Sequence, residues 1–383
     1  MQKEEHNKHN KKNWLLNWAE KRLKNFSSQL GKPNSEDEIH ILNSKELYHL
    51  KKIEKWTVLR AGIAGAISAF FCSLAGIFAY YHFNIDPYQN ISWKDFFIFW
   101  TFTGPIILFF TVIEFYYLYY DGLKSIAKIA YFAGLDLQTE TVYISNLAKA
   151  VLEFDDKDQN ILGINPLKNS SKPKLLFSNI LYKTKIILTN LLLKFLVSRI
   201  LGTVAIRGIF DLIAIPVTAF WDAWVCYQVL REARLRAIGP SSIHERIQSY
   251  FPQPDQLSDE FKSEIIRAVA YIIVSTENFH PNLAYLTIEL YNTLNPKYLE
   301  YPINEELLFQ NLSKFSENES KLLVKIMAFA IIIDGKITKK EKSNFIKFAN
   351  LSKVKIRPDG LKSELRKIYQ GKEFSITSIL VEK

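Results

Sequence analysis

Several ionisable residues fall inside stretches that are otherwise apolar, and four of them are the first candidates for chemistry in this sequence. Arg207 and Asp211 are four residues apart, so their side chains would face each other on a helix. Asp222 follows about three helical turns later and would share that face. With Glu114 they predict a polar seam at membrane depth that carries an ion or senses a partner. The alternative, an ion pair that fastens two membrane segments together, is the role that the sequence favours.

Recognised catalytic motifs are missing from the sequence. It contains no P-loop, dinucleotide-binding glycine pattern, HExxH, CxxC or GxSxG motif. The two cysteines, Cys72 and Cys226, lie in apolar stretches, and each is predicted to be a small buried hydrophobic residue. We therefore expect a protein that is not an enzyme and that uses no cofactor.

The segment 57–120 predicts a transmembrane helical hairpin. Residues 61–85 contain no Asp, Glu, Lys or Arg, and a helix of that length exceeds the ~30 Å hydrocarbon core of a bilayer. Residues 96–120 contain a single charged residue, and Gly104-Pro105 predicts a kink within them. Small residues at every fourth position of the first helix predict close helix packing and offer a surface for a homo-oligomer. These residues are Ala61, Gly65, Ala69 and Ser73.

The segment 186–236 is also apolar, but basic residues flank it on both sides. It predicts either a second membrane hairpin, built from 181–201 and 209–230, or helices that lie in the membrane interface. The distribution of lysine and arginine places both termini in the cytoplasm and the loop near Asn90 outside. The chain is then a multi-pass protein of a bacterial inner (plasma) membrane, with the bilayer as its first partner.

The remaining segments are predicted to be cytoplasmic. Residues 1–56 are polar and acidic enough to exclude a signal or transit peptide. Within them, 12–30 predicts an amphipathic helix that lies on the inner leaflet or packs on the rest of the protein. Residues 121–185 form a connector, with a short helix over 122–134. The net charge of +10 is spread over the whole chain, so nucleic acid is not expected as a partner.

Residues 241–383, which follow Gly239-Pro240, predict a domain of short helices, so the fold class is all-α. Capping boxes are expected at three pairs, each a Ser or Thr followed three residues later by Glu. The pairs are Ser242 with Glu245, Ser316 with Glu319 and Thr338 with Glu341. Within this domain, only residues 374–381 show the alternation of apolar and polar residues that is typical of a β-strand.

Residues 327–341 join an apolar helix, an Asp-Gly turn, one aliphatic residue and an acidic residue that opens the next helix. This pattern resembles the TerB-like (tellurite-resistance/DjlA-type) helical domain. Residues 265–294 resemble a degenerate first half of that family's repeat. The resemblance implies a stress-response role at a membrane and a metal ion held by Asp334 and Glu341. The positive charges of Lys336, Lys339 and Lys340 oppose a metal ion there.

The sequence thus predicts a membrane-anchored stress-response or scaffold protein that acts through contacts of its C-terminal domain with a cytoplasmic protein. The alternative is a small transporter or channel component that uses the charged residues of the second membrane region.

Overall fold

The computed structural model describes residues 14–33, 42–83, 92–138, 141–152, 164, 210–276, 280–297, 299 and 307–381. In these ranges the regular elements are helices, and the only bridge is an isolated one between Ile356 and Leu380. The all-α prediction is therefore confirmed for the described residues. The strand considered at 374–381 is replaced by a short 3₁₀ helix, η3 (Ile376–Ile379).

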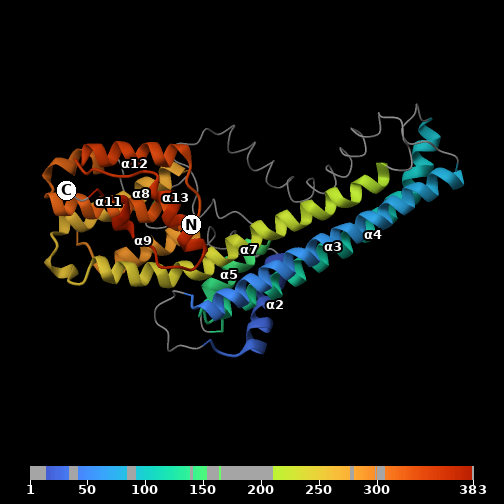
Figure 1. Cartoon of the computed structure of the whole chain (residues 1–383), viewed down its shortest axis with the longest axis horizontal. Helices are drawn as coiled ribbons and strands as arrows, with labels where there is room; N and C mark the ends of the chain where they lie inside the picture. The colour runs from blue at the N-terminus through green and yellow to red at the C-terminus, as the bar shows by residue number, and fades with distance from the viewer. Residues whose placement is uncertain are drawn as a thin grey trace, which may run out of the picture.

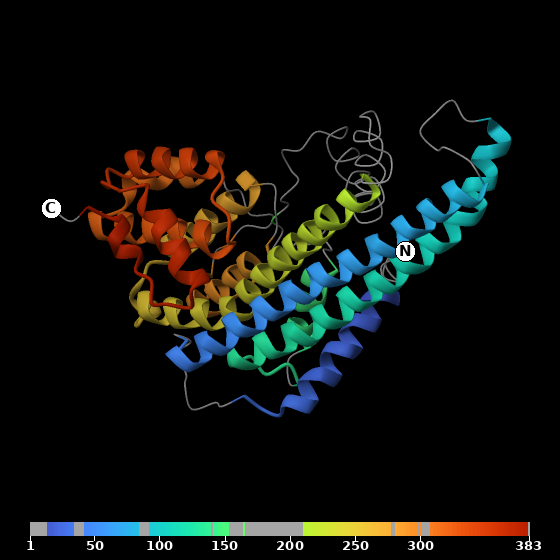
Figure 2. The same cartoon turned by 45° about the vertical axis from the view of Figure 1, so that its right-hand side comes forward.

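Two helices of equal length, α3 (Ser44–Phe83) and α4 (Trp93–Phe132), form the long arm of the molecule (Figures 1 and 2). Both are long and apolar enough to cross a membrane. Only 28% and 11% of their most apolar stretches is buried, whereas the core helix of a soluble protein would be mostly buried. Their apolar side chains instead face outwards, among them Ile63, Ile67, Phe70, Phe78, Leu108, Phe109, Val112 and Ile113.

The helix α4 continues beyond the predicted second span, so the separate short helix expected at 122–134 is wrong: most of that segment is the end of α4. Gly104 and Pro105 also lie inside α4. Figure 1 shows the first turns of this helix at an angle to the rest, as expected for a helix with an interior proline.

The amphipathic segment near the N-terminus forms α2 (Trp14–Leu30), which packs on α4 and on α5 (Thr141–Val151). Leu23 and Phe26 are buried there, and the Phe26 ring lies 5.2 Å from that of Tyr120. Of the two alternatives for this helix, the structure shows packing against the rest of the chain.

The helix α7 (Phe210–Tyr250) runs beside α3 and continues into the C-terminal domain (Figure 1). It passes without a break through Gly239 and Pro240, where the sequence predicted a boundary. The capping box predicted at Ser242 is therefore wrong, because this residue lies inside the helix. Residues 186–209 lie outside the described ranges, so the choice between a second hairpin and interfacial helices stays open.

The C-terminal domain packs its helices around α11, which is buried along its whole second half. The predicted capping boxes at Ser316 and Thr338 are both confirmed. Its helices are α8 (Asp259–Thr276), α9 (Pro281–Leu294), α10 (Leu307–Asn311), α11 (Glu317–Ile333), α12 (Lys339–Leu351) and α13 (Gly360–Tyr369), with 3₁₀ turns η1 (Pro254–Gln256) and η2 (Leu312–Lys314).

Candidate functional site

Asp222, one of the four predicted seam residues, lies on α7 and is only 3% exposed. It packs against Gly65 of α3: a Cβ atom placed on Gly65 would lie 2.0 Å from Asp222 Oδ2 and 3.2 Å from the carbonyl oxygen of Thr218. The predicted close packing along the small-residue stripe is therefore present within one chain. Ala61, Ala69 and Ser73 are buried as well. A homo-oligomer through this stripe stays a prediction.

Glu114 lies on α4 and is also 3% exposed. The antiparallel register of α3 and α4 is defined by the 2.8 Å contact of Thr57 Oγ1 with Ser125 Oγ and by the stacking of Phe71 on Phe110. This register places Glu114 about one helical turn from the level of Gly65, and so from that of Asp222. The structure thus brings two of the four predicted residues to neighbouring depths.

The other two seam residues cannot be placed. Arg207 lies outside the described residues, and Asp211 belongs to α7 without a described side chain. The predicted ion pair between them is therefore not tested.

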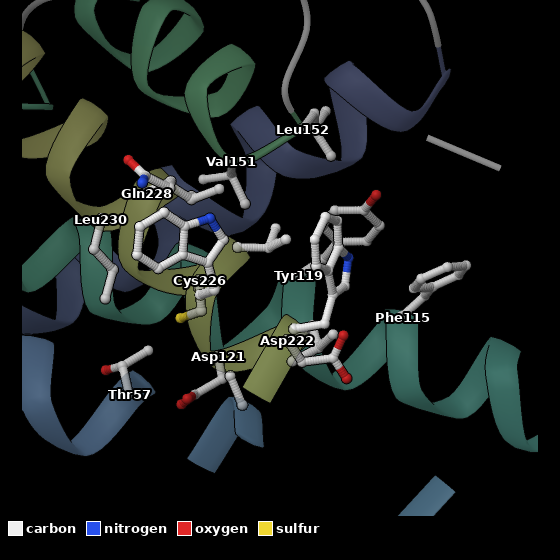
Figure 3. A pocket seen from close by; sticks show the side chains of 17 residues that line it. Thr57, Phe115, Tyr119, Asp121, Val151, Leu152, Asp222, Cys226, Gln228 and Leu230 are labelled. Atoms are coloured by element: carbon white, nitrogen blue, oxygen red, sulfur yellow. The ribbon is translucent and has the colours of Figure 1, made fainter. Parts of the chain in front are cut away.

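A cavity of about 280 Å³ lies between α3, α4, α5 and α7, beside Asp222 (Figure 3). Most of its wall is apolar or aromatic. It is lined by Thr57, Ala61, Phe115, Leu118, Tyr119, Asp121, Gly122, Val151, Leu152, Trp221, Asp222, Trp224, Val225, Cys226, Gln228, Val229 and Leu230. Sequence reasoning missed this cavity because the lining residues come from four helices and form no motif.

Polar side chains close one side of the cavity. Arg60 donates to both carboxylate oxygens of Asp121, from Nε over 2.9 Å and from Nη2 over 3.0 Å. Arg60 Nη2 also donates to the hydroxyl oxygen of Thr57 over 3.2 Å. Arg60 and Asp121 end the two charge-poor runs of the hairpin, so the cavity lies at the predicted inner edge of the membrane. Cys226 lines it and is partly exposed, as is Cys72, so the prediction that both cysteines are buried is wrong.

The turn formed by Asp334 and Gly335 docks on α7. Gly335 adopts a φ of +80°, and the hydroxyl of Tyr369 donates to its carbonyl oxygen over 2.7 Å. The guanidinium carbon of Arg231 lies 4.0 Å from the centre of the Tyr369 ring. A Cβ atom on Gly335 would lie 2.3 Å from Leu235 Cδ2. The turn therefore joins the C-terminal domain to the long helix.

Buried hydrogen bonds around His280 reinforce this joint. Its Nδ1 accepts the N–H of Asn282 over 3.1 Å, so Nε2 carries the proton and donates to Glu232 over 2.9 Å. Burial lowers the pKa of His280, which keeps the ring neutral. Burial alone would raise the pKa of Glu232, but hydrogen bonds from His280 and Arg236 hold it below its ordinary value. The amide of Asn282 donates to the carbonyl oxygens of Leu235 and Ile333, over 3.1 and 3.0 Å, which ties α7, α9 and α11 together.

Asp334 and Glu341, the predicted metal ligands, are both buried. Asp334 accepts the N–H of Lys336 over 3.0 Å, and Glu341 Oε2 accepts that of Thr338 over 2.6 Å. Burial, together with the charge of Glu341, raises the pKa of Asp334 well above its ordinary value, and burial also raises that of Glu341. Two carboxylates can contribute to a cation site, but the described residues contain no group of three or more His, Cys, Asp or Glu side chains that could hold a metal ion. The metal site stays a prediction.

Replacing Asp334 by Asn is expected to stabilise the protein at pH 7 by about 1–2 kcal/mol, because the amide keeps the acceptor for Lys336 and removes a buried charge. The raised pKa means that the folded state binds the proton more tightly, so stability falls as pH rises from about 4 towards that pKa. The gain should therefore vanish below about pH 3, where the Asp334 carboxyl is neutral in both the folded and the unfolded state. Thermal unfolding with and without Mg²⁺ or Ca²⁺ checks this. A stabilisation of the natural chain by the cation that Asp334→Asn abolishes would instead support the metal site.

No family model, no curated protein and no solved structure matches this chain. The TerB-like resemblance therefore stays a prediction that rests on residues 327–341. Within these residues the structure has a left-handed glycine, Gly335, followed by the capping box at Thr338, and neither feature is specific to that family.

Proposed function

We propose that this chain is a non-catalytic scaffold anchored in a bacterial inner membrane, whose C-terminal domain recruits an acidic protein segment. The observation that carries the proposal is α7, a single helix that packs on the apolar hairpin at one end and enters the core of the C-terminal domain at the other. Such a helix holds the domain at a fixed place relative to the anchor. A role in stress response rests on the TerB-like resemblance alone.

Anchoring is supported by the outward-facing apolar side chains of α3 and α4. Exposed apolar surface of this extent marks a protein or membrane contact. The lysines and arginines that flank the hairpin favour a topology with both termini in the cytoplasm. The C-terminal domain then lies on the cytoplasmic side.

The acidic partner is inferred from what we call the basic surface, the exposed lysines and arginines between residues 336 and 373. This segment has 12 Lys and Arg against 4 Asp and Glu, whereas 241–335 has 7 against 13. Two of its four acidic residues, Glu341 and Glu364, are buried. The basic surface consists of Lys336, Lys339, Lys340, Lys347, Lys353, Lys355, Arg357, Lys362, Arg366 and Lys372.

Position along α7 favours a protein over the bilayer as the partner of this surface. Gly62, near the predicted membrane edge, packs against Ala223, whereas Gly335 packs against Leu235. These two α7 residues are twelve positions apart, or about 18 Å along the helix. That separation exceeds the Debye length of about 8 Å at physiological ionic strength. The basic surface begins beside Gly335 and lies on α12, on α13 and on the segment that joins them.

Photo-crosslinking in cells tests the proposal. A photoreactive residue at Lys339 or Lys362 is expected to crosslink to one and the same acidic protein, and Lys340→Glu with Arg366→Glu should reduce the yield about tenfold. The control position is Ile288, which is exposed on α9. Crosslinks to lipid or nucleic acid would contradict the proposal. So would a crosslinking yield that stays the same when Lys340 and Arg366 are replaced by Glu. Cysteine labelling from outside at Asn90 but not at Ser313 checks the topology.

Transport is a second candidate, because Asp222 lines a cavity and Glu114 is buried at a neighbouring depth. Ion flux in reconstituted vesicles that disappears in a folded Asp222→Asn protein would favour it over the scaffold.

A further inference from the structure

We propose that the cavity between α3, α4, α5 and α7 binds an amphiphile that carries an ammonium head group on an apolar chain. This goes beyond the proposed scaffold, because it assigns a ligand class to a site in the membrane-proximal part. Ligand sites in proteins are typically concave, mostly apolar and supplied with a few placed polar groups. This cavity, with its apolar wall and few polar side chains, has that character, and its volume of about 280 Å³ suits an ammonium group with a single apolar chain.

Charge indicates the kind of head group. Among the described residues that line the cavity, Asp121 and Asp222 are acidic, and none is a lysine or an arginine. Arg60 offsets the charge of Asp121 through its two hydrogen bonds. Figure 3 shows Asp222 between Asp121 and Phe115, and this residue is 3% exposed. A carboxylate repels an anionic head group and attracts an ammonium group.

Aromatic side chains favour the same head group. Trp221, Trp224, Tyr119 and Phe115 all line the cavity. The face of an aromatic ring attracts a cation electrostatically, and an ammonium group can therefore contact rings and carboxylate together. The apolar chain of the ligand would lie along apolar side chains of the cavity wall. Examples are Val151 at the end of α5 and Leu230 on α7.

The position of the cavity gives an amphiphile access to it. The Arg60–Asp121 pair marks the predicted inner edge of the hydrocarbon core, the depth at which lipid head groups meet their chains. Two kinds of molecule carry an ammonium group on an apolar chain and could bind here. One is a membrane lipid such as phosphatidylethanolamine, and the other is a free hydrophobic amine.

Cys226 supplies a local probe, because it lines the cavity and is partly exposed. In the full-length chain with Cys72→Ser it is the sole cysteine, and its modification by N-ethylmaleimide reports access to the cavity. In neutral maltoside micelles, dodecylamine is expected to slow this reaction about tenfold at a concentration where dodecanol and dodecyl sulfate have little effect. The matched control is Cys226→Ser, in which the remaining Cys72 should show no protection.

Two variants keep the test decisive. Asp222→Asn should reduce the protection factor of dodecylamine, which is the ratio of the Cys226 reaction rates of the same variant without and with the amine, to the level of dodecanol. Leu118→Phe, which narrows the cavity, should weaken protection by the amine even if Asp222→Asn fails to fold. Equal protection by the alcohol or the sulfate, no protection by the amine, or undiminished protection in both variants would overturn the proposal.

Vesicles distinguish the two sources of the ligand. If protection arises in phosphatidylethanolamine vesicles but not in phosphatidylglycerol vesicles, the ligand is a membrane lipid. If it appears only after dodecylamine is added, the site takes a free amine. Both results support the site, and neither depends on whether the basic surface binds a protein.

Discussion

Gly335→Ala is expected to lower the free energy of unfolding by about 2–5 kcal/mol, because two costs add at this position. The backbone φ of +80° disfavours any residue with a Cβ atom, typically by about 1–2 kcal/mol. The new methyl group would also collide with the packed joint, 2.3 Å from Leu235 Cδ2 and 2.5 Å from the Tyr369 hydroxyl oxygen. Overpacking of this kind costs about 1–3 kcal/mol. The midpoint of thermal unfolding in detergent measures the sum.

Gly31→Ala is the matched control, since Gly31 follows α2 with nearly the same φ, +81°, and a Cβ atom there would meet nothing within 4 Å. It should show the backbone cost alone, about 1–2 kcal/mol. The difference between the two variants then measures how tightly the turn is held on α7. Equal losses would contradict the docking of the Asp-Gly turn described above. Faster hydrogen exchange at residues 335–341 in Gly335→Ala would locate the damage at the joint.

Local features of the fold could be predicted where a short stretch determines its own structure. The capping boxes at Ser316 and Thr338 are such cases, because each hydroxyl and its Glu satisfy backbone groups within one helical turn. The two long apolar runs, residues 61–85 and 96–120, also predicted the helices α3 and α4 of the hairpin. Where the partners of a helix lie far away in sequence, prediction was less complete.

The break predicted at Gly239-Pro240 shows how tertiary contacts outweigh local preference. This dipeptide normally ends a helix. Here the missing side chain of Gly239 admits Asn282, whose amide atoms would lie within 2.5 Å of a Cβ atom at that position. Asn282 in turn hydrogen-bonds to carbonyl oxygens of α7 and α11. Sequence periodicity does not reveal such a contact, because the two residues lie on different helices.

The candidate sites were also only partly visible in the sequence. The small-residue stripe correctly predicted a close helix contact, but its partner on α7 depends on the register of two helices more than 150 residues apart. The basic surface was hidden because charges were summed over 241–383, where the acidic first part cancels it. Counting over a window of about 40 residues, the size of a pair of helices, would have revealed it.

Gly65→Ala tests whether Asp222 is fixed in place, and it is expected to destabilise the protein by about 1–3 kcal/mol through overpacking. The new methyl group would lie 2.0 Å from the Asp222 carboxylate oxygen and 3.2 Å from the Thr218 carbonyl oxygen, so the carboxylate has to move. Gly122→Ala on α4 is the matched control, because its nearest neighbour, Val151 Cγ1, would be at an ordinary 3.5 Å. There the higher helix propensity of alanine should dominate and leave stability unchanged or raised by up to about 1 kcal/mol.

A double-mutant cycle with Asp222→Ala separates the clash from other effects. Removing the carboxylate opens the space above Gly65, so Gly65→Ala should cost little in that background, and the coupling free energy should be about 1–3 kcal/mol. Thermal unfolding of the four proteins gives this value. If Gly65→Ala is instead as harmless as Gly122→Ala in the natural chain, Asp222 can leave its place at little cost. A carboxylate that moves easily is what ion transport requires, whereas one that is held against Gly65 fastens α7 to the hairpin, as the scaffold requires.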